Sequence, residues 1–344
     1  MKKISLLLIN VLFVGLFSCE NAKWEFLDFD YTTVYFPYQT PVRTLVLGNY
    51  EYNTTLQDDN NLNFVISAHM GGVYENKANQ TVDYVIDPTL AVKLKTTAGD
   101  TLEALPSSYY TISPVSQFVI PKGAFYAGFT VQLTDAFLND PLAYKTHYVL
   151  PYVITSTSLD SVLSGKPLVA NPDRRIAGNW SVAPRDYTLF GVKYINQYHG
   201  KYLTRGRSIR QDLATSVPID TMVYRKTYVE NNQIWFLKTL DRNKVTYTGV
   251  VQVKTGSSPG ALKMDLTFDA NGNCTITKNS TSAYNITGTG KFVKDGDSWG
   301  GKKRDAIILS YQITVAATKH IVNDTLVIRD RDARFETFVP VVMP

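Results

Sequence analysis

The stretch 262-LKMDLTFDANGNCTITK-278 determines how the second half of the chain is interpreted. From Leu262 to Phe268, apolar residues alternate strictly with polar ones, which is the pattern of a β-strand with one buried face. Asn271-Gly272 follows, and this pair is the strongest short signal for a tight hairpin turn. Cys274 and Ile276 then resume the alternation, so the stretch predicts two antiparallel strands joined by a hairpin.

The same alternation recurs in the rest of the second half, for example from Leu309 to Val315. Long strands separated by short turns predict an antiparallel meander. Closing it into a calycin- or lipocalin-like β-barrel would leave no exposed edge, and a two-sheet β-sandwich is the alternative. Further strands are expected at Tyr187–Ile195, Met222–Val229, Gln233–Leu240, Val245–Lys254, Tyr284–Val293, Thr325–Arg329 and Phe335–Val341.

The first half contains shorter strand candidates separated by Gly, Pro and Asp turn signals. This pattern predicts an immunoglobulin-like β-sandwich over residues 31–166. Residues 167–175 include two prolines and carry little apolar periodicity, so we expect them to be a linker. The antiparallel barrel domain is then expected at residues 176–344, which makes the whole chain all-β.

Charge supports the division into two domains. Residues 20–170 contain 8 Lys and Arg against 15 Asp and Glu, whereas residues 171–344 contain 25 against 15. The two halves therefore carry opposite net charge. The basic residues of the second half are spread along strands, which is typical of a solvated surface, and no nucleic-acid partner is expected. The 22 Tyr and 16 Phe favour strands throughout.

The first residues indicate export. A positively charged start, Met1-Lys2-Lys3, precedes an apolar run that is too short to span a bilayer but matches a secretory signal. Leu16-Phe17-Ser18-Cys19 resembles the bacterial lipoprotein signal, in which Cys19 becomes the lipidated first residue. We therefore expect a signal peptide at residues 1–18, a tether at 19–30 and an outer-membrane lipid anchor on Cys19.

The segment from Lys294 to Lys303 is the leading candidate for a ligand site. It partly matches a nucleophile elbow, a phosphate loop and a calcium loop, but each match lacks the helix or ligand that its motif requires. An aromatic face in a loop of Gly, Asp and Ser can stack on a sugar ring, so Trp299 is a candidate anchor. Asp297 and Arg304 flank it with hydrogen-bonding groups. The alternative is that Trp299 folds back over a barrel end.

Other side chains give weaker signals. The four histidines are scattered without metal-ligand spacing, so no metal or cofactor is expected. Cys274 lies on a predicted strand and is expected to be a small buried side chain. No arrangement of carboxylates argues for hydrolysis, so no catalytic residue is assigned. Tyr198 and Tyr202 are the next aromatic candidates for ligand contact.

Motifs in both halves carry a resemblance to a known family. In the first half they are Val34-Tyr35-Phe36-Pro37, Gly71-Gly72-Val73, Leu105-Pro106 with Tyr109-Tyr110, Leu133-Thr134-Asp135, Tyr148-Val149-Leu150-Pro151 and Asp160-Ser161-Val162-Leu163-Ser164-Gly165-Lys166. These resemble an N-terminal domain of unknown function that is typical of Bacteroidota polysaccharide-utilisation lipoproteins and is also found ahead of family 18 glycoside hydrolase modules. In the second half, Lys193-Tyr194-Ile195-Asn196 and Tyr198-His199-Gly200-Lys201-Tyr202-Leu203 resemble its usual partner domain.

The resemblance implies a surface lipoprotein that faces the cell exterior and binds oligosaccharide or polysaccharide without catalysis. It also implies an outer-membrane glycan transporter complex as a partner. Three alternatives stay open: a glycoside hydrolase or its accessory, a structural or adhesive surface subunit, and a carrier of an apolar ligand inside the barrel. Two carboxylates in one cleft would favour the hydrolase. A cavity inside the barrel would favour the carrier, and an exposed aromatic patch would favour the glycan binder.

Overall fold

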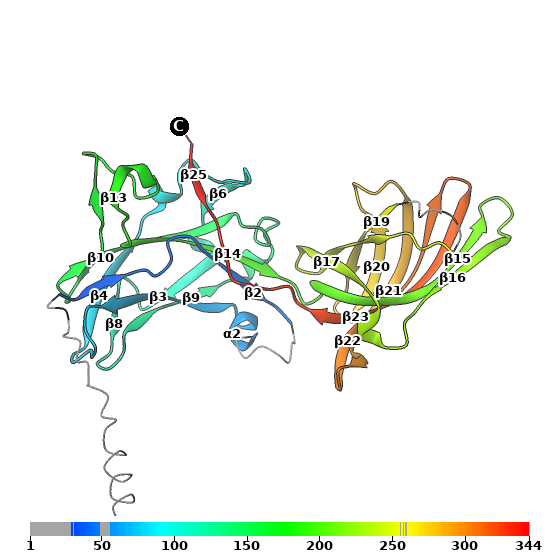
Figure 1. Ribbon diagram of the computed structural model, residues 1–344, viewed down its shortest axis with the longest axis horizontal. Helices are drawn as coiled ribbons and strands as arrows, with labels where there is room; N and C mark the ends of the chain where they lie inside the picture. Colours follow the sequence, from blue (N-terminus) through cyan, green and yellow to red (C-terminus); the bar gives the residue numbers. More distant parts are fainter. Residues whose placement is uncertain are drawn as a thin grey trace, which may run out of the picture.

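The computed structural model describes residue 29 and residues 31–48, 56–254, 256, 258 and 260–343. The predicted signal peptide, Cys19 and nearly all of the tether lie outside these ranges. Two β-rich bodies lie side by side, a sandwich built mostly from the first half and a barrel built from the second (Figure 1). Within the described ranges, no helix is long and apolar enough to cross a membrane.

The sandwich consists of two sheets that share a core. Its smaller sheet contains, in spatial order, β11 (Ser161–Val162), β1 (Thr33–Tyr35), β3 (Asn63–Gly71), β9 (Tyr126–Leu133) and β7 (Tyr110–Ser113). Its larger sheet contains β24 (Glu336–Thr337), β2 (Pro41–Val46), β14 (Tyr187–Ile195), β10 (Tyr148–Thr157), β6 (Thr101–Ala104), β5 (Leu94–Thr96) and β25 (Pro340–Val342), with β4 (Gln80–Ile86) paired to β10 and β8 (Gln117–Ile120) paired to β4.

Aromatic rings connect the two sheets of the sandwich. Phe129 from β9 lies with its ring centroid 4.2 Å from that of Tyr84 on β4 and 4.6 Å from that of Tyr152 on β10. All three side chains are buried, so the apolar faces of the two sheets pack directly against each other. The predicted sandwich is therefore confirmed.

Shorter elements fill the connections. The helices are α2 (Leu56–Asn60) and α3 (Asp135–Leu138), and the 3-10 turns are η1 (Pro88–Ala91), η2 (Ser107–Tyr109), η3 (Ala177–Asn179) and η4 (Val229–Asn231). The strands β12 (Lys166–Pro167) and β13 (Trp180–Val182) pair with each other as a separate two-stranded sheet. The predicted linker at 167–175 connects this small pair, and the chain then returns to the sandwich.

The barrel is a closed antiparallel meander. It contains β15 (Gly200–Asp212), β17 (Gln233–Asp241), β18 (Lys244–Val250), β19 (Ala261–Phe268), β20 (Asn273–Lys278), β21 (Asn285–Trp299), β22 (Lys302–Val315) and β23 (Thr318–Asp330), and β15 pairs with β23 to close it. A further strand, β16 (Pro218–Tyr224), pairs with the outer part of β15. The predicted hairpin joins β19 to β20, with Gly272 at a φ of 79°. The predicted barrel is therefore confirmed.

Two strands that the sequence placed after the linker, Tyr187–Ile195 and Phe335–Val341, belong to the sandwich, as β14 and as the pair β24 and β25. β14 pairs with β10 on one side and with β2 on the other, and β24 and β25 pair with β2 and β5. β14 reads as a nearly continuous apolar run because both of its faces are covered, with Val192 in one core cluster and Leu189 in another. The barrel is therefore inserted between two segments of the sandwich.

Candidate functional site

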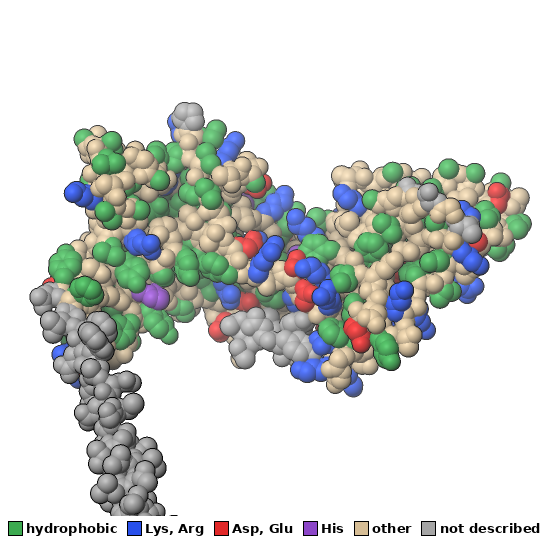
Figure 2. Space-filling model, in the orientation of Figure 1, with side chains coloured by type: hydrophobic (Ala, Val, Ile, Leu, Met, Phe, Trp, Pro, Cys, Tyr) green, Lys and Arg blue, Asp and Glu red, His purple; other side chains and the backbone are tan. Residues whose placement is uncertain are grey.

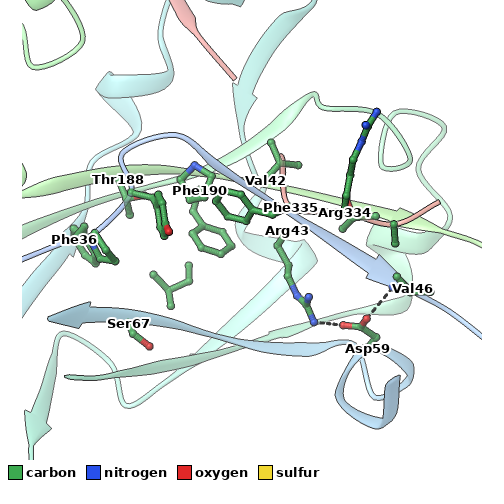
Figure 3. A pocket seen from close by; sticks show the side chains of 16 residues that line it. Phe36, Val42, Arg43, Val46, Asp59, Ser67, Thr188, Phe190, Arg334 and Phe335 are labelled. Carbon is green, nitrogen blue, oxygen red and sulfur yellow. Dashed lines mark hydrogen bonds and ion pairs between the residues drawn. The ribbon is translucent and has the colours of Figure 1, made fainter. Parts of the chain in front are cut away.

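A pocket of about 390 Å³ lies in the sandwich, where β2 and β14 face β3 (Figure 3). We call it the sandwich pocket. Its volume falls in the range of about 300–1,000 Å³ that is usual for small-molecule sites. Its walls come from five separate parts of the chain, including the segment that returns from the barrel. The residues that define it are Phe36, Arg43, Asp59, Thr188, Phe190 and Phe335.

Four aromatic side chains, those of Phe36, Tyr38, Phe190 and Phe335, form part of the pocket wall. Phe190 is stacked on Phe64, with ring centroids 5.5 Å apart and planes 7° from parallel. Tyr38 and Phe335 stand at the rim with centroids 5.0 Å apart, and they are 54% and 64% exposed. Phe335 reaches this position because the chain after β23 crosses back to the sandwich. The rim therefore presents two aromatic side chains to solvent next to an apolar recess.

An ion pair contributes charge to the pocket. The guanidinium of Arg43 pairs with the carboxylate of Asp59, which also accepts a hydrogen bond from the backbone N–H of Val46 at 2.9 Å. Burial raises the pKa of the Asp59 carboxyl, while the Val46 N–H and Arg43 oppose that rise. Arg43 is half-buried, and among the described residues its remaining N–H groups bond to nothing else. These groups are available to ligand hydroxyls.

Two buried threonine hydroxyls also line the pocket. The Oγ1 atoms of Thr44 and Thr188 are inaccessible to water and have no hydrogen-bond partner within the described part of the chain. A buried polar atom without a partner costs about 1–3 kcal/mol, so native proteins rarely leave one without a reason. Both threonines also line the recess, so either hydroxyl would gain a partner if its side chain turned toward a bound ligand.

The structure brings three of the sequence-predicted site residues together. Trp299, Asp297 and Arg304 lie at the ends of β21 and β22, where the expected loop is instead a hairpin turning at Gly300 and Gly301. The indole N–H of Trp299 donates to the carbonyl of Ile328 at 3.0 Å, and the guanidinium of Arg304 lies 4.1 Å from the indole ring. Asp297 pairs with Arg205.

These contacts leave Trp299 half-buried, with Arg304 over one face of its ring. The expectation of a solvent-facing Trp in a loop is therefore corrected, because an extended hairpin supplies the neighbours that a loop would lack. Tyr198 and Tyr202 are 2% and 1% exposed. Tyr198 stacks on Phe268 at 3.7 Å, so both tyrosines belong to the barrel core and neither meets a surface ligand. Cys274 is buried in the same core, as predicted.

Sequence reasoning did not find the sandwich pocket. Its residues are distributed over the chain from Phe36 to Phe335, and the one motif among them, Val34-Tyr35-Phe36-Pro37, indicates a family and not a ligand site. The strongest local signal is Tyr38, which lies between Pro37 and Pro41. Prolines favour turns, so an aromatic side chain is expected in a turn at this position. That signal identifies a rim residue but gives no indication of its partner Phe335.

Fold and geometry together define a two-domain, all-β protein in which a β-barrel is inserted into a β-sandwich. A family model described as "Domain of unknown function (DUF5627)" matches residues 197–332, which is the barrel. A second model, described as "-like, N-terminal domain", matches residues 29–161 of the sandwich. Among curated proteins, none matches this chain.

A solved structure of a Bacteroides ovatus protein of unknown function is 34% identical, with a TM-score of 0.83, and the match covers 92% of this chain and all of that chain. The protein described here belongs to the same family. A Bacteroides ovatus multidomain protein including DUF1735 is 11% identical over 89% of this chain and 99% of its own, with a TM-score of 0.42. A Bacteroides thetaiotaomicron structure described as an auxiliary nutrient binding protein is 14% identical over 77% and 82%, with a TM-score of 0.37. These last two are too distant to bear on function.

Proposed function

We propose that this protein binds glycan without catalysis, and that the sandwich pocket is its binding site. The observation that carries the proposal is the rim pair of Tyr38 and Phe335 beside the Arg43–Asp59 ion pair. A sugar ring has an apolar face that stacks on aromatic side chains, and hydroxyls at its edge that need donors and acceptors. The pocket offers both kinds of group within one recess.

The other classes fit the geometry less well. A glycoside hydrolase needs two carboxylates about the scissile bond, whereas Asp59 is the single carboxylate among the described residues that line the pocket, and it is paired with Arg43. A carrier of an apolar ligand needs an empty barrel. The described interior of the barrel holds a packed cluster that runs from Tyr198 to Ile328.

The proposal includes a location at the outer membrane, facing the cell exterior, with the lipid anchor on Cys19. It also includes a glycan transporter complex in the same membrane as a partner. The support is the lipoprotein-type sequence ending at Cys19. In cells that process lipoproteins, Cys19→Ala should leave the chain unlipidated and release it from the membrane fraction. Membrane partition equal to that of the parent protein would refute the anchor.

The binding test uses the soluble chain from residue 20 onward on a glycan array, followed by calorimetric titration of the best ligand. Tyr38→Ala and Phe335→Ala should each weaken binding about 10-fold or more, as expected for loss of an aromatic anchor. Tyr126→Ala is the matched control, because Tyr126 is 62% exposed on β9 and is not part of the pocket. No array binding, or equal affinity in all variants, would overturn the proposal, and cleavage of the bound glycan would favour the hydrolase.

A further inference from the structure

A second pocket, of about 300 Å³, lies where the sandwich meets the barrel. We call it the junction pocket. β14 supplies Lys193 to its wall, β17 of the barrel supplies Lys238, and the returning segment supplies Arg334. The sandwich pocket and the junction pocket share Thr44, Ala333 and Arg334, so they adjoin across the same short piece of chain.

The junction pocket has an excess of positive charge. Its two carboxylates are already engaged, because Glu336 pairs with Lys193 at 2.7 Å and Asp332 pairs with Lys201. Lys238 and Arg334 are exposed and form no ion pair within the described residues. Figure 2 shows lysine and arginine side chains, with a few acidic ones among them, gathered where the two bodies meet. In the close-up of the sandwich pocket, Arg334 extends away from Asp59 (Figure 3).

His199 adds a neutral donor to this pocket. Its Nδ1 accepts a hydrogen bond from the backbone N–H of Thr239 at 3.0 Å, so the ring carries its proton on Nε2. Burial, together with the positive charges of Arg331, Lys238 and Lys193, lowers the pKa of His199 to about 3, and the nearby Asp332 carboxylate opposes this only in part. Those cations disfavour a protonated imidazole, and the same field attracts an anion. Tyr144 completes the wall with an aromatic side chain.

From this arrangement we infer that the junction pocket binds the anionic group of an acidic saccharide, with Lys238 and Arg334 as the charged contacts and His199 as a neutral donor. The inference rests on the proposed glycan-binding function and adds the chemical class of the glycan. Two cations that form no ion pair among the described residues, in a recess of this size, match a carboxylate or a sulfate ester. A neutral part of the same saccharide would then extend over Ala333 toward Tyr38 and Phe335 in the sandwich pocket.

The test compares galactose, galacturonate and galactose 6-sulfate as probes, titrated into the parent protein by ligand-observed NMR. We expect the two acidic sugars to bind at least about 10-fold more tightly than galactose, with affinity that falls as salt is raised. Their relative affinities identify carboxylate or sulfate as the preferred group. Inorganic sulfate that binds as tightly as galactose 6-sulfate would show a simple anion site and overturn the saccharide assignment, as would equal binding of all three sugars.

Lys238→Ala separates this inference from the proposed function, because Lys238 lines the junction pocket and not the sandwich pocket. It should weaken the binding of the acidic sugars about 10-fold or more, so that their preference over galactose disappears. The affinity for a neutral glycan should stay unchanged. Lys278→Ala, at an exposed lysine on β20, is the matched control. If Lys238→Ala leaves the preference intact, the inference fails even when Tyr38→Ala and Phe335→Ala weaken neutral binding. If Lys238→Ala removes the preference but Tyr38→Ala and Phe335→Ala leave neutral binding unchanged, the proposed function fails instead.

Discussion

The guanidinium of Arg331 donates hydrogen bonds from both Nη1 and Nη2 to the backbone carbonyl oxygen of Leu47, each at 3.1 Å, across 284 positions of sequence. Its Nε donates to the carbonyl of His199 at 2.7 Å, and Nη2 also donates to Asn196. The side chain is 5% exposed. One buried cation therefore joins the end of β2, the connection into the barrel and the segment that leaves it.

Arg331→Ala should destabilise the protein by about 2–4 kcal/mol, because it removes the side-chain donors from three backbone carbonyl groups, those of Leu47, Asn196 and His199. Arg331→Lys should recover little of this loss, since one ammonium cannot replace a planar fork that reaches three acceptors. Chemical unfolding measures the cost, and small-angle scattering should show a wider distribution of sizes as the two bodies separate. A variant with parental stability and parental scattering would contradict the assigned role.

Asp324 gives a pH-dependent stability inside the barrel. Its carboxylate accepts hydrogen bonds from the hydroxyls of Tyr224 and Tyr311, and it is 3% exposed. Burial raises its pKa to about 6, against the lowering effect of the two tyrosines. Between about pH 4 and pH 6 the folded state therefore binds more protons than the unfolded state, so this group's contribution to stability falls as pH rises through that window.

Asp324→Asn should remove this dependence. The free energy of unfolding of the variant, relative to the parent, should rise by up to roughly 3 kcal/mol between about pH 4 and pH 7. This is the free energy that corresponds to a shift of the carboxyl pKa from 3.8 to about 6. Urea unfolding at several pH values measures this difference, in which carboxylates common to both proteins cancel. A difference that is constant with pH would show that Asp324 has an ordinary pKa.

Trp299→Ala should lower stability by about 1–3 kcal/mol, because it removes the hydrogen bond to Ile328 and the ring beneath the Arg304 guanidinium. Trp299→Phe keeps a ring and should recover part of the loss. Glycan affinity should remain that of the parent, since Trp299 is not part of the sandwich pocket. Lost glycan binding at an unchanged melting temperature would instead support the prediction made from the sequence.

Truncation tests how the two bodies depend on each other. A chain of residues 197–332 should unfold in one cooperative transition, because β15 and β23 close the barrel within it. A chain of residues 31–166 should fail to fold, because it lacks β14, whose Leu189, Val192 and Tyr194 are fully buried in the sandwich. Circular dichroism and thermal unfolding of both pieces provide the measurement. Cooperative unfolding of the shorter piece would contradict the importance of β14.

The barrel could be predicted from sequence because each of its strands has one face toward the interior and one toward water. That geometry produces the alternation at Leu262–Phe268, and Asn271-Gly272 marks the turn that follows. The sandwich strand β14 is covered on both faces, so its sequence shows no alternation and gives no indication of which sheet it joins. Its assignment to the second domain followed from chain order alone.

The candidate site was less predictable for a related reason. The contact between Tyr38 and Phe335 depends on the chain crossing back from the barrel, which no local pattern records. Trp299 was predicted to lie exposed in a loop because glycines and aspartates surround it in sequence. Those residues instead belong to two long strands and their turn. Local composition indicates that a side chain lacks apolar neighbours in sequence, but its neighbours in space decide whether it is exposed.

The insertion of the barrel also sets an order of assembly. β24 and β25 pair with β2 and β5, which precede them by more than 200 residues, so these early strands remain without those partners until the whole barrel has been synthesised. Unpaired strand edges are templates for pairing between chains. The nascent protein therefore passes through a stage in which its sandwich is incomplete while its barrel is ready to close. Strands made after the barrel thus cover edges of strands that were made before it.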